Sequence, residues 1–272
     1  MGLHLLIDAD SSIYKAGLSN ETRLYQAFDE EGCVVHECQY KADMDKWMET
    51  EEAVAGGYES AKVRFAGPLA HSLQNIKRVC QAMIAVEHTS YKLYISGKGN
   101  FRKDIYPEYK ANRTAADRPV HEKEIREYLK KYWNASEVDG EEVDDRVSWE
   151  QCTSNYPTCI VAIDKDLLNT PGLNYNYDTG VLTDISPEQG TLNFARQLLT
   201  GDSTDNIPGL KGIGPKTANK LLPSLLPNWQ DIVLEKYKEQ FGDEAEEKMV
   251  LYGRLLWMRR KPDEMWDLDY EY

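Results

Sequence analysis

Acidic side chains gather in short clusters along this chain of 272 residues. The carboxylates that stand out are those of Asp8, Asp10, Glu142, Asp144, Asp145, Asp164, Asp166, Asp202 and Asp205. Carboxylate oxygens are the ligands of Mg²⁺ or Mn²⁺, whereas zinc favours nitrogen and sulfur ligands. Two such ions about 4 Å apart can hydrolyse a phosphodiester, one activating water and the other stabilising the leaving oxygen. We therefore expect an enzyme that uses two ions of Mg²⁺ or Mn²⁺.

Short apolar runs precede two of these clusters and predict the strands that position them. Leu3–Ile7 ends at Asp8, and Thr158–Ile163 ends at Asp164. Both runs have the composition of buried parallel strands, and Tyr91–Ile95 predicts a third. Because parallel strands end at one edge of a sheet, their terminal carboxylates should meet there.

Some of these acids also have simpler interpretations. Acids in a first helical turn stabilise the helix dipole by about 0.3 to 1 kcal/mol each. After Gly140, however, four acids stand within one turn, and a divalent cation relieves their repulsion most directly. Asp202 and Asp205 are three residues apart and would share one face of a helix.

Asp10 has two open interpretations. It could face the same side of an extended strand as Asp8, because residues i and i+2 point the same way. Alternatively, it could cap the helix expected to start near Ser11.

The remaining pattern predicts an α/β fold with a central, mostly parallel sheet flanked by helices. Residues 1–190 should form this core, and residues 191–272 a helical region. We expect helices over 69–87, 193–200, 229–241 and 244–259, and a hairpin over 173–183 at the sheet edge. The acid-rich segment 29–59 is interpreted as surface helix and loop without chemistry.

Basic residues are concentrated in one segment. Residues 98–131 contain ten Lys and Arg against six acids, or +4, whereas the whole chain carries −14 and the remainder therefore −18. Within this segment Lys110 and Arg113 could hold a phosphate while Tyr109 offers a face for base stacking. A solvated helix of mixed charge is the alternative interpretation.

Asp202 and Asp205 lie in the first half of the stretch 201–222, GDSTDNIPGLKGIGPKTANKLL. The second half of this stretch contains no acid. The residues of that half that could bind an anion are Lys211, Gly212, Gly214, Lys216 and Lys220. Neither a dinucleotide fingerprint nor a phosphate-binding P-loop fits, because the required glycines and Gly-Lys-Ser/Thr are absent. The Gly-x-Gly alone is more typical of glycines that cap helices.

Composition favours a soluble, intracellular protein. The longest apolar runs are far short of a membrane span, and no signal peptide is recognisable, so a cytoplasmic location is expected. Five cysteines without metal-binding spacing predict free thiols.

The string 201–222 closely resembles the helix-three-turn-helix element of the 5′ nuclease family, which includes flap endonucleases and phage 5′ to 3′ exonucleases. The E-x-D-D string at Glu142, Asp144 and Asp145 resembles the family's central metal-binding element, and PEYKANR at 107–113 resembles its arch entrance. Similarity extends from Leu3 to about Leu222 and is strongest to the short phage exonucleases.

The resemblance implies a 5′ nuclease core with a basic helical arch at about 97–135 and a DNA-binding region beyond residue 191. It implies Lys110 and Arg113 as catalytic cations and metal ligation by the clustered acids. It also implies DNA with 5′ ends or flaps as the substrate, RNA-DNA hybrids as a further substrate, and K⁺ held by loop carbonyls in 201–222. Ser96 departs from the pattern, because relatives carry an aspartate there.

Two other classes remain open. A PIN-like ribonuclease shares the strand-end acids but has no use for the 201–222 hairpin. A DNA-binding module with a degenerate active site is supported by Ser96 alone.

Overall fold

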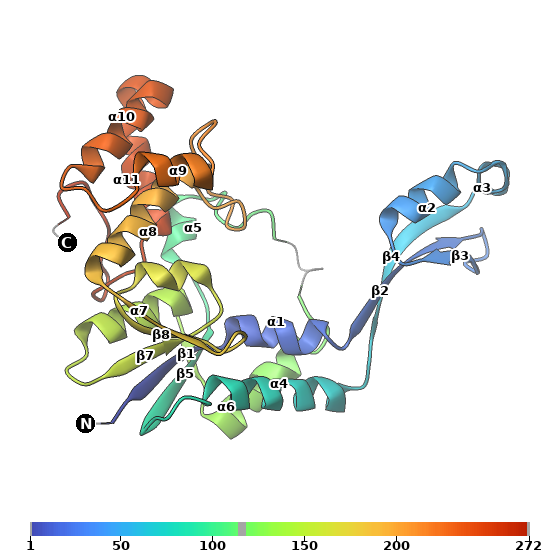
Figure 1. Cartoon of the computed structure of the whole chain (residues 1–272). Helices are drawn as coiled ribbons and strands as arrows, with labels where there is room; N and C mark the ends of the chain where they lie inside the picture. The colour runs from blue at the N-terminus through green and yellow to red at the C-terminus, as the bar shows by residue number, and fades with distance from the viewer. Residues whose placement is uncertain (1, 114–117, 271–272) are drawn as a thin grey trace.

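The computed structural model describes residues 2–113 and 118–270. Its main sheet has six strands in the order β6-β5-β1-β7-β8-β9. Their bounds are β1 His4–Asp8, β5 Ser90–Ser96, β6 Ser136–Val138, β7 Thr158–Val161, β8 Gly172–Asn176 and β9 Val181–Ile185. All neighbouring strands are parallel except β8 and β9, which form an antiparallel hairpin at the edge. This confirms the predicted α/β fold with a mostly parallel sheet (Figure 1).

The two faces of β1 explain how the helices are layered on the sheet. Leu5 and Ile7 pack with helices α1, α4 and α6 on one face, whereas Leu6 packs with α7 on the other. The helix bounds are α1 Asp10–Leu18, α4 Leu69–Met83, α6 Glu122–Trp133 and α7 Val143–Thr153. Because side chains alternate along a strand, an apolar β1 needs cover on both sides. It is therefore a central strand, and Asp8 at its end is 4% exposed.

The C-terminal part forms a second, helical core. Its helices are α8 Pro187–Thr200, α9 Pro215–Leu221, α10 Trp229–Phe241 and α11 Ala245–Leu256, and 3₁₀ turns lie at η2 Lys165–Asn169 and η3 Gly242–Glu244. Phe194 of α8 contacts the rings of Trp257 and Trp266 at centroid distances of 4.8 and 5.2 Å. A Cβ on Gly253 would lie 2.1 Å from the Trp266 ring, so this close packing requires glycine. Trp257 and Trp266, which follow α11, thus complete this core.

Residues 21–66 form a small unit that projects from the core, called here the projecting module (Figure 1). Its elements are β2 Glu21–Phe28, β3 Val34–Cys38, α2 Lys41–Met48, α3 Glu51–Gly56 and β4 Glu59–Ala66. The strands form a separate antiparallel sheet in the order β3-β2-β4. The prediction of surface helix and loop over 29–59 is confirmed for α2 and α3, but it missed strand β3 and the sheet to which it belongs. Strand β2 pairs with β4 across more than thirty residues of sequence, and no local pattern reports that pairing.

The expected arch begins and ends on the core. Helix α5, Phe101–Ile105, carries the fully buried Arg102, and α6 buries Ile125 and Leu129. Residues 114–117, in the middle of the expected arch, lie outside the described residues. The described ends of the segment are thus anchored, and they bring Lys110 and Arg113 to the end of the main sheet.

Among the described residues, every helix is too short or too polar to span a bilayer. All five cysteines are free thiols, as predicted.

Candidate metal and phosphate site

Two strand ends present acids through the same local bond. The backbone N–H of Asp10 donates to Asp8 Oδ1 at 2.9 Å, and that of Asp166 donates to Asp164 Oδ1 at the same distance. Each bond turns the chain sharply after its strand and fixes the first carboxylate at the sheet edge. Since β1 and β7 are adjacent and parallel, Asp8 and Asp164 come close enough for their charges to interact.

Asp144, in the first turn of α7, joins these two acids. Burial, followed by the negative charges of Asp8 and Asp164, raises the pKa of Asp144 well above its usual value. For Asp8, burial and the charge of Asp10 raise the pKa from 3.8 to about 8. Asp144 Oδ1 is buried and has no hydrogen-bond partner among the residues that the structure describes. An unpaired buried carboxylate oxygen is costly, and a cation would relieve that cost.

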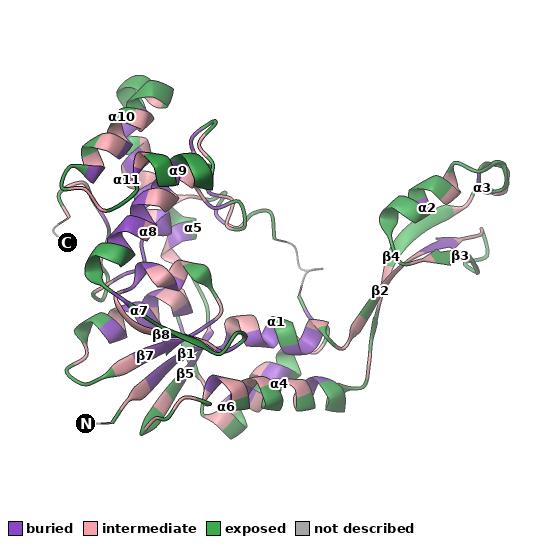
Figure 2. Cartoon of the chain, in the orientation of Figure 1, coloured by how far each residue is buried: buried purple, intermediate pink, exposed green. Residues whose placement is uncertain are grey.

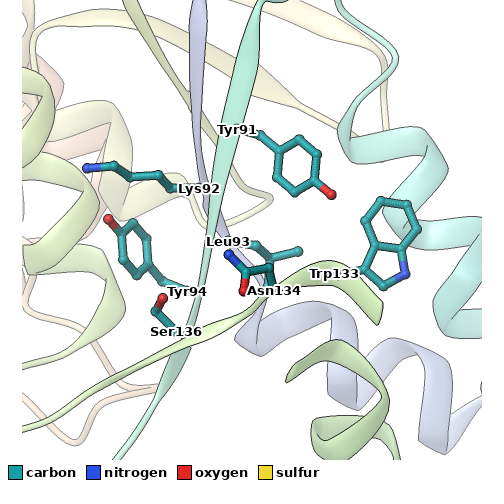
Figure 3. A pocket seen from close by; sticks show the side chains of 7 residues that line it. All are labelled: Tyr91, Lys92, Leu93, Tyr94, Trp133, Asn134 and Ser136. Atoms are coloured by element: carbon teal, nitrogen blue, oxygen red, sulfur yellow. The ribbon is translucent and has the colours of Figure 1, made fainter. Parts of the chain in front are cut away.

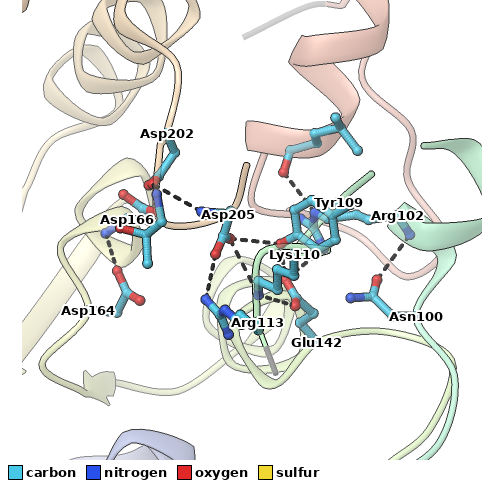
Figure 4. Close-up of polar contacts among 12 residues, drawn as sticks. Asn100, Arg102, Tyr109, Lys110, Arg113, Glu142, Asp164, Asp166, Asp202 and Asp205 are labelled. Atoms are coloured by element: carbon cyan, nitrogen blue, oxygen red, sulfur yellow. Dashed lines mark hydrogen bonds and ion pairs between the residues drawn. The ribbon is translucent and has the colours of Figure 1, made fainter. Parts of the chain in front are cut away.

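Asp166 and Asp202 form a neighbouring group with Asp164. Burial, then the charges of Asp164 and Asp202, raises the pKa of Asp166 from 3.8 to about 7. Gln197 Nε2 donates to Asp166 Oδ1 at 2.9 Å, so helix α8 helps to orient this carboxylate. The acids at the sheet edge therefore continue toward the helical region (Figure 4).

The expectation that Asp202 and Asp205 share a helical face was wrong. Helix α8 ends at Thr200, and Gly201 adopts a φ of +66°. The chain then turns, with Asp202 and Ile207 exchanging backbone hydrogen bonds of 2.8 and 2.9 Å. Asp202 Oδ1 accepts from the backbone of Thr204 at 2.7 Å. As a result, Asp202 faces Asp166, whereas Asp205 faces the basic segment.

Lys110 and Arg113 lie against carboxylates rather than in open solvent (Figure 4). Lys110 pairs with Glu142 and lies 3.4 Å from Asp205, and Arg113 bonds Asp205 at 2.6 Å. Burial alone would raise the pKa of Glu142, but the charges of Lys110 and Arg102 lower it to about 2. Glu142 is thus a carboxylate at neutral pH, and both cations stand beside the acid groups as predicted.

Tyr109 does not offer a base-stacking face. Its side chain is 2% exposed and packs in the helical core. Its hydroxyl donates to Glu142 at 2.8 Å and lies 2.9 Å from Asp205. The predicted stacking role is therefore wrong, and the residue instead holds two carboxylates in place.

Asp145 does not face the acid groups either. It is fully buried and forms a bidentate ion pair with Arg102, whose Nη2 donates to Asp145 Oδ1 at 2.9 Å. Arg102 also donates to the backbone carbonyls of Leu255 and Trp257 at 2.8 Å. Asp145 was predicted as a metal ligand, but its oxygens are occupied by this pair. Sequence reasoning missed Arg102 because nothing local in FRKDI distinguishes a buried arginine from a solvated one.

Asp10 at the start of α1 pairs with Ser96 at the end of β5. The Ser96 backbone N–H donates to Asp10 Oδ1 at 2.9 Å, and its hydroxyl donates to Oδ2. Helix α1 begins at Asp10 without a side-chain cap, and β1 ends at Asp8, so both the capping interpretation and the extended-strand interpretation were wrong. The charge of Asp10 instead reaches the acid group.

The anion-binding residues predicted in 201–222 lie on the surface. Their positions are Lys211, Gly212, Gly214, Lys216 and Lys220, all exposed. Gly212 has a φ of +80°, which lets the chain turn before α9. The two glycines have open space around them, so a ligand could approach this backbone closely.

The acid groups fit a divalent metal by their chemistry. Their donors are all oxygens, which suits Mg²⁺ or Mn²⁺. Among the described residues, however, no three metal-binding side chains already converge on one point. The acids are thus neighbours around a shared region rather than a closed cage.

A cavity of about 370 Å³ lies elsewhere, lined by residues such as Tyr91, Trp133 and Ser136 (Figure 3). It sits beside the start of β5, whereas the acids lie where the parallel strands end. Its lining includes no carboxylate, so it is not part of the acid site.

The curated relatives of the chain include DNA polymerases I, flap endonucleases and a 5′-3′ exonuclease. No protein-family model matches the chain. A DNA polymerase I from Rhizobium leguminosarum is 35% identical over 139 residues, which is 45% of this chain and 14% of that protein. A 5′-3′ exonuclease from Aquifex aeolicus is 28% identical over 176 residues, which is 57% of this chain and 59% of that protein. The chain is thus similar in sequence to proteins of the 5′ nuclease family.

The family relationship concerns only part of these relatives, because the matches span 14% of the polymerase and 59% of the exonuclease. A solved bacteriophage T5 flap endonuclease, in a pseudo-enzyme-product complex with DNA and metal ions, is 17% identical. It has a TM-score of 0.47, covering 69% of this chain and 80% of that one.

Proposed function

We propose that the chain is a metal-dependent 5′ nuclease that hydrolyses phosphodiesters in DNA from 5′ ends or at 5′ flaps. One observation carries the proposal: acids from β1, α7 and η2 gather at the ends of parallel strands, directly beside Lys110 and Arg113. Carboxylates suit divalent cations, and the neighbouring cations suit a phosphate. The 5′-3′ exonuclease of Aquifex aeolicus is a relative whose name agrees with this activity.

The residues that would hold the metal fall into two groups. Asp8, Asp144 and Asp164 form the first, and Asp164, Asp166 and Asp202 the second. When bound, Mg²⁺ or Mn²⁺ would supply an activated water and stabilise the leaving oxygen. The raised pKa values of Asp8 and Asp166 support this assignment, because cations favour the deprotonated carboxylates that burial and repulsion disfavour.

Lys110 and Arg113 would contact the phosphate to be cleaved. Both now pair with Glu142 or Asp205, and these pairs keep the two cations within reach of the acid groups. A phosphate that displaced the carboxylates would receive charge-assisted hydrogen bonds from both side chains. They would orient it and stabilise its developing negative charge.

Lys211, Lys216 and Lys220 would hold the duplex away from the cleaved bond. In this proposal residues 1–190 form the nuclease core and residues 191–272 the DNA-binding region. The loop before α9 would hold K⁺ through backbone carbonyls. Similarity to short phage exonucleases supports a role in phage DNA replication in the host cytoplasm, with RNA-DNA hybrids as a further substrate.

The test compares cleavage of 5′-labelled duplex, 5′-flap DNA, RNA-DNA hybrid and single-stranded RNA, with Mg²⁺ and with a chelator. We expect Mg²⁺-dependent release of short products from the 5′ ends of the DNA substrates. The double variant Asp164→Asn plus Asp166→Asn should not cleave, yet should bind DNA in Ca²⁺ nearly as the wild type does. Asp184→Asn, an exposed change on β9, is the matched control.

Cleavage of single-stranded RNA alone would replace this proposal with a PIN-like ribonuclease. DNA binding without cleavage in either Mg²⁺ or Mn²⁺ would instead indicate a binding module.

A further inference from the structure

The sheet of the projecting module is covered on one face only. Ala27 of β2 pairs with His36 of β3, and the His36 ring stacks on Trp47 of α2 at 4.3 Å. Ala27 and Met44 are buried on this side, which α2 covers. In Figure 1 both helices lie on one side of the three strands.

The opposite face, called here the open face, is largely apolar. Paired residues of neighbouring strands point to the same side of a sheet, so the pairs Leu24 with Val63 and Phe28 with Val34 place four apolar side chains there. Phe65 extends the same row. Val34 is 50% exposed and Phe65 is 48% exposed. Gln26 and Glu37 lie between these two pairs. An exposed apolar surface of this kind indicates a binding partner rather than scattered surface residues.

Strand alternation also separates the charges of the module. The bases Arg23, Lys62 and Arg64 all point to the helix-covered side. Within β2, β3 and β4, all of whose residues are described, the charged side chains of the open face are the acids Glu37 and Glu59. The whole module, 21–66, has eleven acids and five bases, or −6. A partner on the open face therefore meets negative charge around apolar side chains.

We propose that the open face is a docking surface for a cationic, apolar segment of another protein. A phosphate backbone would meet only carboxylates on this face, which disfavours DNA as the occupant. Two copies joined through it would bring Glu37 and Glu59 near their own counterparts, on chains that each carry −14. A segment that alternates basic and apolar residues complements both features, and charge complementarity gives specificity and fast association.

The test measures binding of a fluorescent octapeptide of alternating lysine and valine to the full chain by anisotropy. We expect binding that weakens with salt, and at least tenfold weaker binding to Phe65→Ser. The control Tyr132→Ser removes an aromatic ring of 62% exposure from α6 and should leave binding unchanged. An octapeptide of alternating glutamate and valine, and octalysine, should bind at least tenfold more weakly than the lysine-valine peptide.

A charge-reversal pair keeps the test valid if Phe65→Ser fails to fold. Glu59→Lys places a base on the open face, whereas Glu51→Lys makes the same change in net charge on α3. The proposal requires Glu59→Lys to weaken peptide binding and Glu51→Lys to leave it nearly unchanged. Equal effects of both changes would overturn it.

Two further outcomes would also overturn the proposal, because each assigns the face to another occupant. The first is displacement of the lysine-valine peptide by a DNA oligonucleotide that binds this face. The second is a dimer that analytical sedimentation detects for the wild type and that Phe65→Ser dissociates.

Discussion

Asp144 and Asp145 are neighbours in the sequence with opposite surroundings. Asp144 faces other acids and keeps a buried oxygen without a partner among the described residues. Asp145 is fully buried and paired with Arg102. Successive residues on a helix point about 100° apart, so one turn of α7 serves both the acid group and the contact with the C-terminal region.

These surroundings predict opposite effects of the same substitution. Asp145→Asn should lose about 3 to 5 kcal/mol of stability, because it leaves the Arg102 charge buried and uncompensated. Asp144→Asn should keep or raise stability, because it removes repulsion from Asp8 and Asp164, but it should abolish cleavage. Urea unfolding and nuclease assays on both variants check this. Equal loss of stability in the two variants would contradict the assignment.

Asp8 gives a prediction about pH in the presence of a chelator. Burial and the charge of Asp10 raise the pKa of Asp8 from 3.8 in the unfolded chain to about 8 in the folded one. Between these values the folded chain holds a proton that the unfolded chain has released. The contribution of Asp8 to stability is therefore fully present below about pH 4 and is lost as the pH rises toward about 8.

Asp8→Asn removes this titration, so its melting temperature relative to the wild type should rise from about pH 5 to about pH 8. Thermal unfolding of both proteins in chelator checks the prediction, with the exposed change Asp184→Asn as a control. A difference between Asp8→Asn and the wild type that stays constant with pH would show that Asp8 is not protonated in the folded chain.

The sequence predicts the acids that end strands better than the acids and aromatics around them. Asp8 and Asp164 follow apolar runs, and parallel strands must end at one edge, so their proximity follows from local pattern. Tyr109 and Asp145 were assigned wrongly because their surroundings come from distant parts of the chain. Arg102, which pairs with Asp145, also donates hydrogen bonds to the backbone carbonyls of Leu255 and Trp257. No local sequence pattern predicts such contacts.

Helices and strands also differ in how well the sequence predicts them. Helix α4 follows from apolar periodicity, and the strands β1, β5 and β7 follow from short apolar runs, because each of these elements is packed in the core. The projecting module was missed because β2 and β4 pair across a long separation and leave one face uncovered. Half-buried strands are recognised by apolar residues on the covered face and polar residues on the exposed one. In β2 and β4 the bases instead lie on the helix-covered side and apolar side chains lie on the open face.

Two elements should contribute differently to DNA binding and cleavage. Lys110 and Arg113 lie beside Glu142 and Asp205, whereas Lys216 lies exposed on α9. Lys110→Ala and Arg113→Ala should mainly lower turnover. Lys216→Ala should mainly weaken duplex affinity and reduce its salt dependence by about one counterion.

Single-turnover rates and duplex affinities over a range of salt concentrations separate these effects. If all three variants lost affinity equally and kept the wild-type turnover, the distinction between catalytic cations and DNA anchor would be wrong.

Over the whole molecule, basic and acidic residues are concentrated in different regions. The chain carries −14, yet residues 98–131 carry +4 and the projecting module −6. Phosphate binding depends on local basic residues rather than on the sum, so the net charge does not exclude DNA. The acidic excess is placed partly at the strand ends, where metal ions could offset it, and partly on the projecting module. Figure 2 shows that this module stands away from the core and consists mostly of exposed and intermediate residues.

The proposed nuclease activity requires the clustered acids to bind divalent ions. Anomalous scattering from crystals soaked in Mn²⁺ tests this directly. We predict one Mn²⁺ peak bounded by Asp8, Asp144 and Asp164, and a second bounded by Asp164, Asp166 and Asp202. Asp145 should remain paired with Arg102 and contact neither ion. If crystals soaked in saturating Mn²⁺ showed no peak at this edge of the sheet, or showed peaks only elsewhere on the surface, the proposed metal site would be wrong.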